Sequence, residues 1–138
     1  MVVIDAKGAV VGRLGARIAK LLLAGQQVEI INADSAVMVG TLSVAREKYL
    51  SRRHQKNKRT PEDSPVWPRR PHLLLRRMLR GMLPHKSQRG RDAYARLRVS
   101  SGATEGAKTL KITEASSEAK HGLFTLAELC KELGGKSN

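Results

Sequence analysis

The fold is decided by residues 2–31, VVIDAKGAVVGRLGARIAKLLLAGQQVEII. The β-branched run Val2–Ile4 predicts a short strand, and the apolar run 28–31 predicts a second one. Between them, apolar residues recur at helical spacing from Val11 onwards, and Gly25 follows at the position of a C-terminal cap. Strands that alternate with helices in this way pair in parallel through right-handed crossovers. The stretch therefore predicts an α/β layered fold.

The same patterns predict the other elements along the chain. Thr41 is expected to cap a helix with its side chain, and Thr125 and Glu128 have the spacing of a capping box. Three prolines punctuate the polar segment 51–70, which is expected to be a long loop, and such loops in compact domains are often functional. Short strands are expected at residues 36–39, 97–100 and 110–112, helices at 41–50, 71–82, 91–96 and 125–133, and further loops at 85–90 and 101–107.

Positive charge is concentrated in the middle of the chain. The net charge is +14, and residues 46–98 hold 17 Lys/Arg against 4 Asp/Glu, a net of +13. Because acidic partners are scarce and arginines predominate, this segment suits bidentate contacts with phosphate better than a solvated face. Aromatic residues make up only 3% of the chain, so platforms for stacking single-stranded bases are few. The composition therefore favours binding to folded RNA or duplex through the phosphate backbone.

The expected helix at 71–82 has two contrasting sides. Its apolar stripe is predicted to consist of Leu75, Met78, Leu79 and Met82, although Leu73 falls outside it. Three arginines gather on the opposite side, at positions 76, 77 and 80. The helix is therefore expected to pack with one side and to bind nucleic acid with the other.

Several other classes of site are disfavoured. The single cysteine, Cys130, excludes an internal disulfide and a cysteine-based zinc site, and its apolar surroundings predict a small core residue. The glycines at 8, 12 and 15 match neither the Walker loop nor the dinucleotide pattern, although a helix start flanked by Lys7 and Arg13 suits an RNA phosphate. No signal peptide or membrane span is evident, so a cytoplasmic location is expected. The histidines lack metal-ligand spacing and are expected to be solvated or to face phosphate: His54, His72, His85 and His121.

Two stretches of the chain resemble a known family. The opening, Asp5–Leu14 with Val28–Ala33, resembles the L-thirteen family of universal large-subunit ribosomal proteins. The segment Arg80–Lys86 and the residues that follow it to Val99 resemble the archaeal and eukaryotic branch, with Arg-Gly-Met-Leu-Pro as the most specific motif. The short chain favours the archaeal type. Beyond Val99 the resemblance weakens.

The resemblance implies a fold and a role. The fold would be a three-layer α/β/α arrangement around a small, mostly parallel sheet of about four strands, with a basic loop–helix insertion. Residues 1–138 would form a single domain. The protein would be a structural constituent of the large ribosomal subunit that binds and stabilises folded large-subunit rRNA, supports subunit assembly and touches neighbouring ribosomal proteins. It would have no catalytic activity, no cofactor and no small-molecule substrate.

Sixteen basic residues are candidate RNA contacts. Five match the basic motifs of the family, at positions 13, 80, 86, 89 and 91, whereas Arg76 and Arg77 are added from the helical pattern alone. Two alternatives remain open at this point: a free-standing RNA- or DNA-binding regulator, and a nucleotide-using α/β enzyme that would rest only on the early glycines. The full set of candidates is Lys7, Arg13, Arg17, Arg52, Arg53, Lys56, Lys58, Arg59, Arg69, Arg70, Arg76, Arg77, Arg80, Lys86, Arg89 and Arg91.

Overall fold

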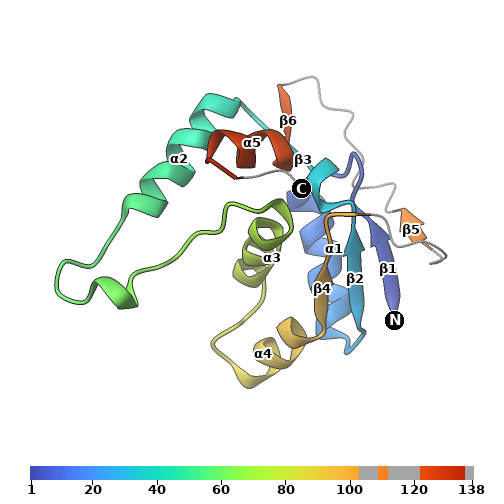
Figure 1. Ribbon diagram of the computed structural model, residues 1–138. Coiled ribbons are helices and arrows are strands. Elements are labelled where there is room, and N and C mark those ends of the chain that lie inside the picture. The colour runs from blue at the N-terminus through green and yellow to red at the C-terminus, as the bar shows by residue number, and fades with distance from the viewer. Residues whose placement is uncertain (103–108, 112–121, 136–138) are drawn as a thin grey trace.

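The computed structural model of the protein describes residues 1–102, 109–111 and 122–135 (Figure 1). These residues form a mixed α/β structure with two sheets. In chain order the elements are β1 (Val2–Asp5), α1 (Val11–Leu23), β2 (Val28–Ile31), the 3-10 turn η1 (Ala33–Ser35), β3 (Val37–Val39), α2 (Leu42–His54), the 3-10 turn η2 (Pro61–Asp63), α3 (Pro71–Met82), α4 (Gln88–Ala95), β4 (Leu97–Val99), β5 (Thr109–Lys111), β6 (Leu123–Thr125) and α5 (Leu126–Glu132).

The larger sheet has the strand order β4-β2-β1-β5, and every pairing in it is parallel. Ile4 lies opposite Ile30, and Val28 lies opposite Leu97, so buried side chains align across three strands. The alternation of strands and helices at the start of the chain predicted this arrangement, and the α/β class is confirmed. The strand near residue 36 was expected, but β3 pairs antiparallel with β6, for which the sequence gives no strand signal, and forms a separate two-stranded sheet.

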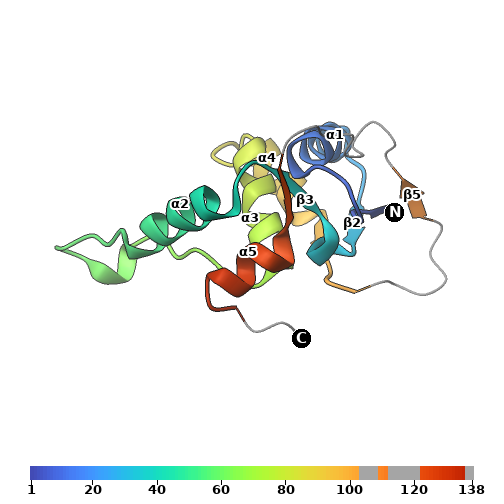
Figure 2. The ribbon, with the colours of Figure 1, turned by 90° about the horizontal axis from the view of Figure 1, so that it is seen from above.

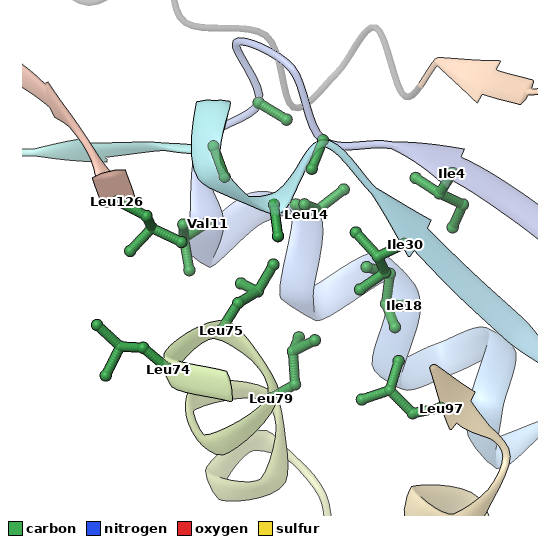
Figure 3. Packing of buried hydrophobic residues seen from close by; sticks show 14 of the residues in the cluster. Ile4, Val11, Leu14, Ile18, Ile30, Leu74, Leu75, Leu79, Leu97 and Leu126 are labelled. Atoms are coloured by element: carbon green, nitrogen blue, oxygen red, sulfur yellow. The ribbon is translucent and has the colours of Figure 1, made fainter. Parts of the chain in front are cut away.

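The main core lies between the larger sheet and the helices α1, α3 and α4, and α5 also contributes buried residues to it. Figure 2 shows α1 and α4 on the same side of the strands, with α3 beside them. α3 contacts β4, and α1 contacts both α3 and α4. The close view in Figure 3 shows side chains from the sheet and the helices meeting in one cluster. Each fully buried Leu or Ile there stabilises the fold by roughly 1.5–3 kcal/mol. The labelled members of the cluster are Ile4, Val11, Leu14, Ile18, Ile30, Leu74, Leu75, Leu79, Leu97 and Leu126.

Two helices are longer than expected. α2 continues to His54, so the long loop begins later than residue 51, and the Thr41 side chain makes no capping hydrogen bond. α4 begins at Gln88 rather than 91, because the Ser87 hydroxyl oxygen accepts a hydrogen bond of 3.3 Å from the Gly90 N–H and caps the helix start. The second half of the expected basic loop at 85–90 is therefore helix.

The buried stripe of α3 also differs from the expected one. Leu75 and Leu79 are buried, as predicted, but the third buried residue is Leu74. Met82 is 41% exposed because it lies in the last turn, where it covers Gly15 of α1 at the edge of the contact. Leu73 lies outside the core, as its position on the arginine side indicated.

The last helix agrees with its sequence signals. The Thr125 N–H donates to Glu128 Oε2 over 2.9 Å, and the Glu128 N–H donates to Thr125 Oγ1 over 3.2 Å, which confirms the capping box. Cys130 is buried on this helix, as expected, and burial, aided by the negative charge of Asp34, raises its pKa to about 12. The thiol is therefore a neutral packing group at physiological pH. The strand expected near 110 is present as β5, and most of the expected turn at 101–107 lies outside the described residues.

The segment between α2 and α3, residues 55–70, projects from the sheet and is here called the arm (Figure 1). Trp67, in the second half of the arm, contacts both flanking helices, α2 and α3. The Trp67 ring meets the Tyr49 ring edge-on at 5.7 Å, and the guanidinium carbons of Arg52 and Arg77 lie 5.0 and 4.4 Å from its centroid. Each such cation–π contact stabilises by about 0.5–2 kcal/mol. The arm is thus held at its base by an aromatic ring between two arginines.

We expect Gly90→Ala to destabilise the protein by about 1–3 kcal/mol, because the added methyl group overlaps backbone atoms that cannot yield. A Cβ at Gly90 would collide with the carbonyl oxygen of Pro84. Urea unfolding measures the effect. Gly12→Ala is the matched control, since a Cβ at Gly12 meets no atom within 4 Å. Equal stability of the two variants would contradict the close approach of α4 to the preceding turn.

We expect Trp67→Leu to release the arm while leaving the core folded. The variant loses both cation–π contacts and the edge contact with Tyr49, so trypsin should cleave faster at Lys56, Lys58 and Arg59, whereas the urea midpoint should shift only slightly. Val66→Ala is the control because Val66 is 77% exposed. Cleavage of the Trp67 variant at the control rate would show that the ring does not hold the arm.

Candidate nucleic-acid interface

The basic segment 46–98 forms a continuous part of the molecule. It runs through the second half of α2, the arm, α3, α4 and β4, which occupy the left and lower parts of Figure 1. Arg46 Nε pairs with Glu132 Oε2 of α5 at 3.3 Å, with both side chains about half exposed. In the described part of the chain, the basic side chains of the arm, α3 and α4 form no ion pair with an acidic residue. Their charge is therefore uncompensated inside the protein.

Nine of the sixteen candidate residues lie exposed on the arm, α3, α4 or the turn between these two helices. The arm contributes five of them, and none of the nine is covered by another part of the described structure. Long cationic side chains on a surface are free to follow a phosphate backbone. The nine residues are Lys56, Lys58, Arg59, Arg69, Arg70, Arg80, Lys86, Arg89 and Arg91.

Four candidates are half-buried and engaged within the protein. Arg52 and Arg77 stack on the Trp67 ring. Arg76 lies over the Tyr94 ring at 4.9 Å, with its Nε buried and unpartnered, and so links α3 to α4. A stacked guanidinium keeps its N–H edge available, so these arginines hold the elements together and still carry charge at the surface.

Arg53 ties α2 to the end of α5. Its Nη1 donates to the Leu133 carbonyl oxygen over 3.2 Å. Partial burial, with a smaller effect from the charge of Arg69, lowers the pKa of Arg53, but a guanidinium stays protonated in proteins. The residue therefore contributes a fixed positive charge at the base of the arm.

The three remaining candidates lie on the other side of the core. Lys7 precedes α1, and Arg13 and Arg17 are on the exposed side of α1, so the structure does not place them with the arm. Two N–H groups of the turn at residues 5–9 are engaged within the protein. The Lys7 N–H donates to Asp5 Oδ1, and the Gly8 N–H donates to the Ser35 carbonyl oxygen. Because the Gly8 N–H is engaged within the protein, it is not available to cradle a phosphate, which disfavours the nucleotide-using alternative.

The organising role of the aromatic residues was not predicted. Trp67 lies beside a hollow of about 220 Å³ that is lined by Arg77, Arg80, Gly81 and His85. Arg52 lies over the ring of Tyr49 on its own helix, but the rings of Trp67 and Tyr94 meet arginines of other elements, which the local sequence does not indicate. The pattern of aromatic residues excluded stacking of many bases but did not identify this internal function.

The other sequence-based expectations concern histidines and membranes. His72 Nδ1 lies 2.8 Å from the Ser101 hydroxyl, so this side chain bonds within the protein rather than facing solvent. His54 is exposed, His85 borders the hollow, and His121 lies outside the described residues. Within the described ranges, no three potential metal-ligating side chains gather, and no helix is long and apolar enough to cross a bilayer.

Comparison with known proteins identifies the family. The family model for ribosomal protein L13 matches residues 1–105. The chain is 38% identical to the large ribosomal subunit protein uL13 of Methanococcus maripaludis, with 99% of both chains covered. It is 43% identical to the protein of the same name from Archaeoglobus fulgidus, over 96% of this chain and 86% of the relative, and 40% identical to that from Methanocaldococcus jannaschii, over 99% of both. The likeness to archaeal relatives thus extends beyond residue 99, where the motifs had faded. The chain belongs to the ribosomal protein L13 family.

Proposed function

We propose that this chain is a structural constituent of the large ribosomal subunit, where it binds and stabilises folded rRNA and supports subunit assembly. Membership of the family carries the assignment to the ribosome. The charge of residues 46–98, of which only Arg46 pairs with an acidic side chain in the described structure, supports a phosphate backbone as the ligand. The role needs no catalytic group, which agrees with a family of structural ribosomal proteins. Its location would be the cytoplasmic ribosome.

The binding mechanism is neutralisation of phosphates by presented cations. The nine exposed Lys and Arg side chains on the arm, α3 and α4 would supply most contacts. The half-buried arginines would keep these elements in place as a preformed surface, which lowers the ordering entropy paid on binding. If about eight phosphates are neutralised, the logarithm of the binding constant should fall with the logarithm of salt concentration with a slope of roughly −5 to −7.

The proposed role extends beyond the arm, α3 and α4. Neighbouring ribosomal proteins are further partners that family membership implies, and Lys7, Arg13 and Arg17 would reach RNA from a second side of the molecule.

We also propose that residues 1–138 form one domain with a third layer on the far side of the sheet. Val3 and Ile31 alternate with the cluster-facing residues of their strands yet are also buried, which supports such a covering layer.

Sedimentation tests the ribosomal assignment. In a lysate of cells that produce the protein, we expect it to travel with large-subunit particles at moderate salt and to leave them at high salt, because phosphate contacts weaken as counterions are added. A protein that sediments free of these particles at moderate salt would contradict the assignment. It would instead favour a free-standing RNA- or DNA-binding regulator.

The salt dependence of binding tests the mechanism. For the triple variant Arg80→Gln, Arg89→Gln and Arg91→Gln, we expect the slope against large-subunit rRNA to flatten by roughly 2–3, since each lost phosphate contact removes about 0.7–0.9. Filter binding across a salt series gives the slope. Arg46→Gln is the control, because this guanidinium already pairs with Glu132. A slope that the triple variant leaves unchanged would show that α3 and α4 do not meet phosphate.

A further inference from the structure

The hollow beside Trp67 has the composition of an anion site. Its lining contains two guanidinium groups, an imidazole and an indole, and no acidic side chain. The guanidinium carbon of Arg77 lies over the Trp67 ring, 4.4 Å from the ring centroid, while Arg80 is exposed one turn further along α3. In the described structure neither arginine has a hydrogen-bond acceptor or an acidic partner. Two unpaired guanidinium groups bordering one hollow leave a positive potential that an anion would relieve.

Stacking prepares Arg77 for such a ligand. The Trp67 ring covers one side of the Arg77 guanidinium and limits its movement, while the fork of N–H donors has no acceptor in the described structure. A phosphate group matches this fork with two oxygens at once. Arg80 extends from the next turn of the same helix and lines the same hollow, but its side chain is exposed and only Arg77 is held by the ring. The hollow therefore differs from the exposed cations of the arm, which have no such support.

Gly81 borders the hollow and has open space in front of its backbone. A Cβ at this position would meet no atom within 4 Å, and its backbone φ is not positive, so the fold itself does not require glycine there. Glycine even lowers helix stability relative to alanine. Gly90 is different, because the Pro84 backbone occupies the space of its Cβ. At Gly81 the free volume faces the hollow, where a ligand can approach the α3 backbone closely.

We propose that this hollow binds a single phosphodiester group of RNA, held by Arg77 and Arg80, with His85 at its border and Trp67 supporting Arg77. The inference rests on the proposed function and deepens it by assigning one fixed phosphate position within a broad basic surface. A free phosphate ion or a mononucleotide presents the same chemistry, so the experiment must separate these sources from RNA.

The fluorescence of Trp67 can report on binding at the hollow. Trp67 is the single tryptophan of the chain, so its fluorescence reports on this hollow while filter binding reports on the whole surface. With the full chain and a large-subunit rRNA fragment, we expect saturable filter binding and a Trp67 emission change with the same midpoint. Inorganic phosphate and adenosine monophosphate at matched concentrations should leave the emission unchanged, since they lack the neighbouring contacts.

Three results would contradict the proposal that the hollow binds an RNA phosphate. RNA that binds on the filter without altering Trp67 emission would refute the hollow but leave the proposed function intact. An emission change that inorganic phosphate saturates and RNA does not would assign the hollow to a small anion. Absence of RNA binding in both assays would refute the proposed function and the site with it.

Variants test which residues hold the phosphate. Arg80→Gln should weaken RNA binding by about tenfold or more and abolish the emission change, because a charge-assisted contact is lost at the hollow. Arg91→Gln, an exposed cation that does not line the hollow, should weaken binding while the emission change persists. Loss of the emission change in both variants, or in neither, would contradict the assignment.

A pair of substitutions at position 81 tests the hollow most directly. Gly81→Glu adds a negative charge to the hollow and Gly81→Gln adds the same bulk without charge, so we expect both to weaken RNA binding, the glutamate more strongly. Ser43→Glu makes the same change in net charge at an exposed position in the first turn of α2 that does not line the hollow. It should weaken binding less than Gly81→Glu. Equal losses, in variants whose unfolding midpoints show intact folds, would mean that only net charge matters and would overturn the site.

Discussion

The contact between α1 and α3 is the constraint on which the rest of the structure depends. α3 buries Leu75 and Leu79 against the core, and Gly15 lets Met82 of α3 approach the α1 backbone closely. The same helix carries arginines on its other side, so apolar burial determines where its charges point. The arm before α3 and the helix after it take their positions from this docking. A scaffold of little net charge thereby presents a basic surface.

The start of the fold could be predicted because its signals are local. Strand, helix and strand follow one another within residues 2–31, and their alternation requires parallel pairing. The β3–β6 pair could not be predicted, since both strands are three residues long and their partners lie in distant parts of the chain. The extension of α2 to His54 could not be predicted for a related reason. Its last turn is polar, and its contacts, such as that of Arg53 with the Leu133 carbonyl, are long-range.

The sequence predicts which residues make up the candidate surface but not how they are arranged in space. Counting charges identified the basic residues, and a sequence pattern treats all of them alike. The structure divides them into exposed cations, such as Arg89, and stacked ones, such as Arg76 over Tyr94. The division depends on which ring each guanidinium meets, which is a property of helix packing rather than of local sequence. The few aromatic residues of the described structure thus position arginines within the protein.

Cross-linking within purified large subunits tests the central claim most directly. The claim is that the arm, α3 and α4 are the main surface that meets rRNA. After ultraviolet irradiation and digestion, the account predicts that RNA-linked peptides of this protein come chiefly from residues 55–91, and that β6 and α5 yield few. RNA-linked peptides that come chiefly from residues 123–135, with none from the arm or α3, would contradict the account.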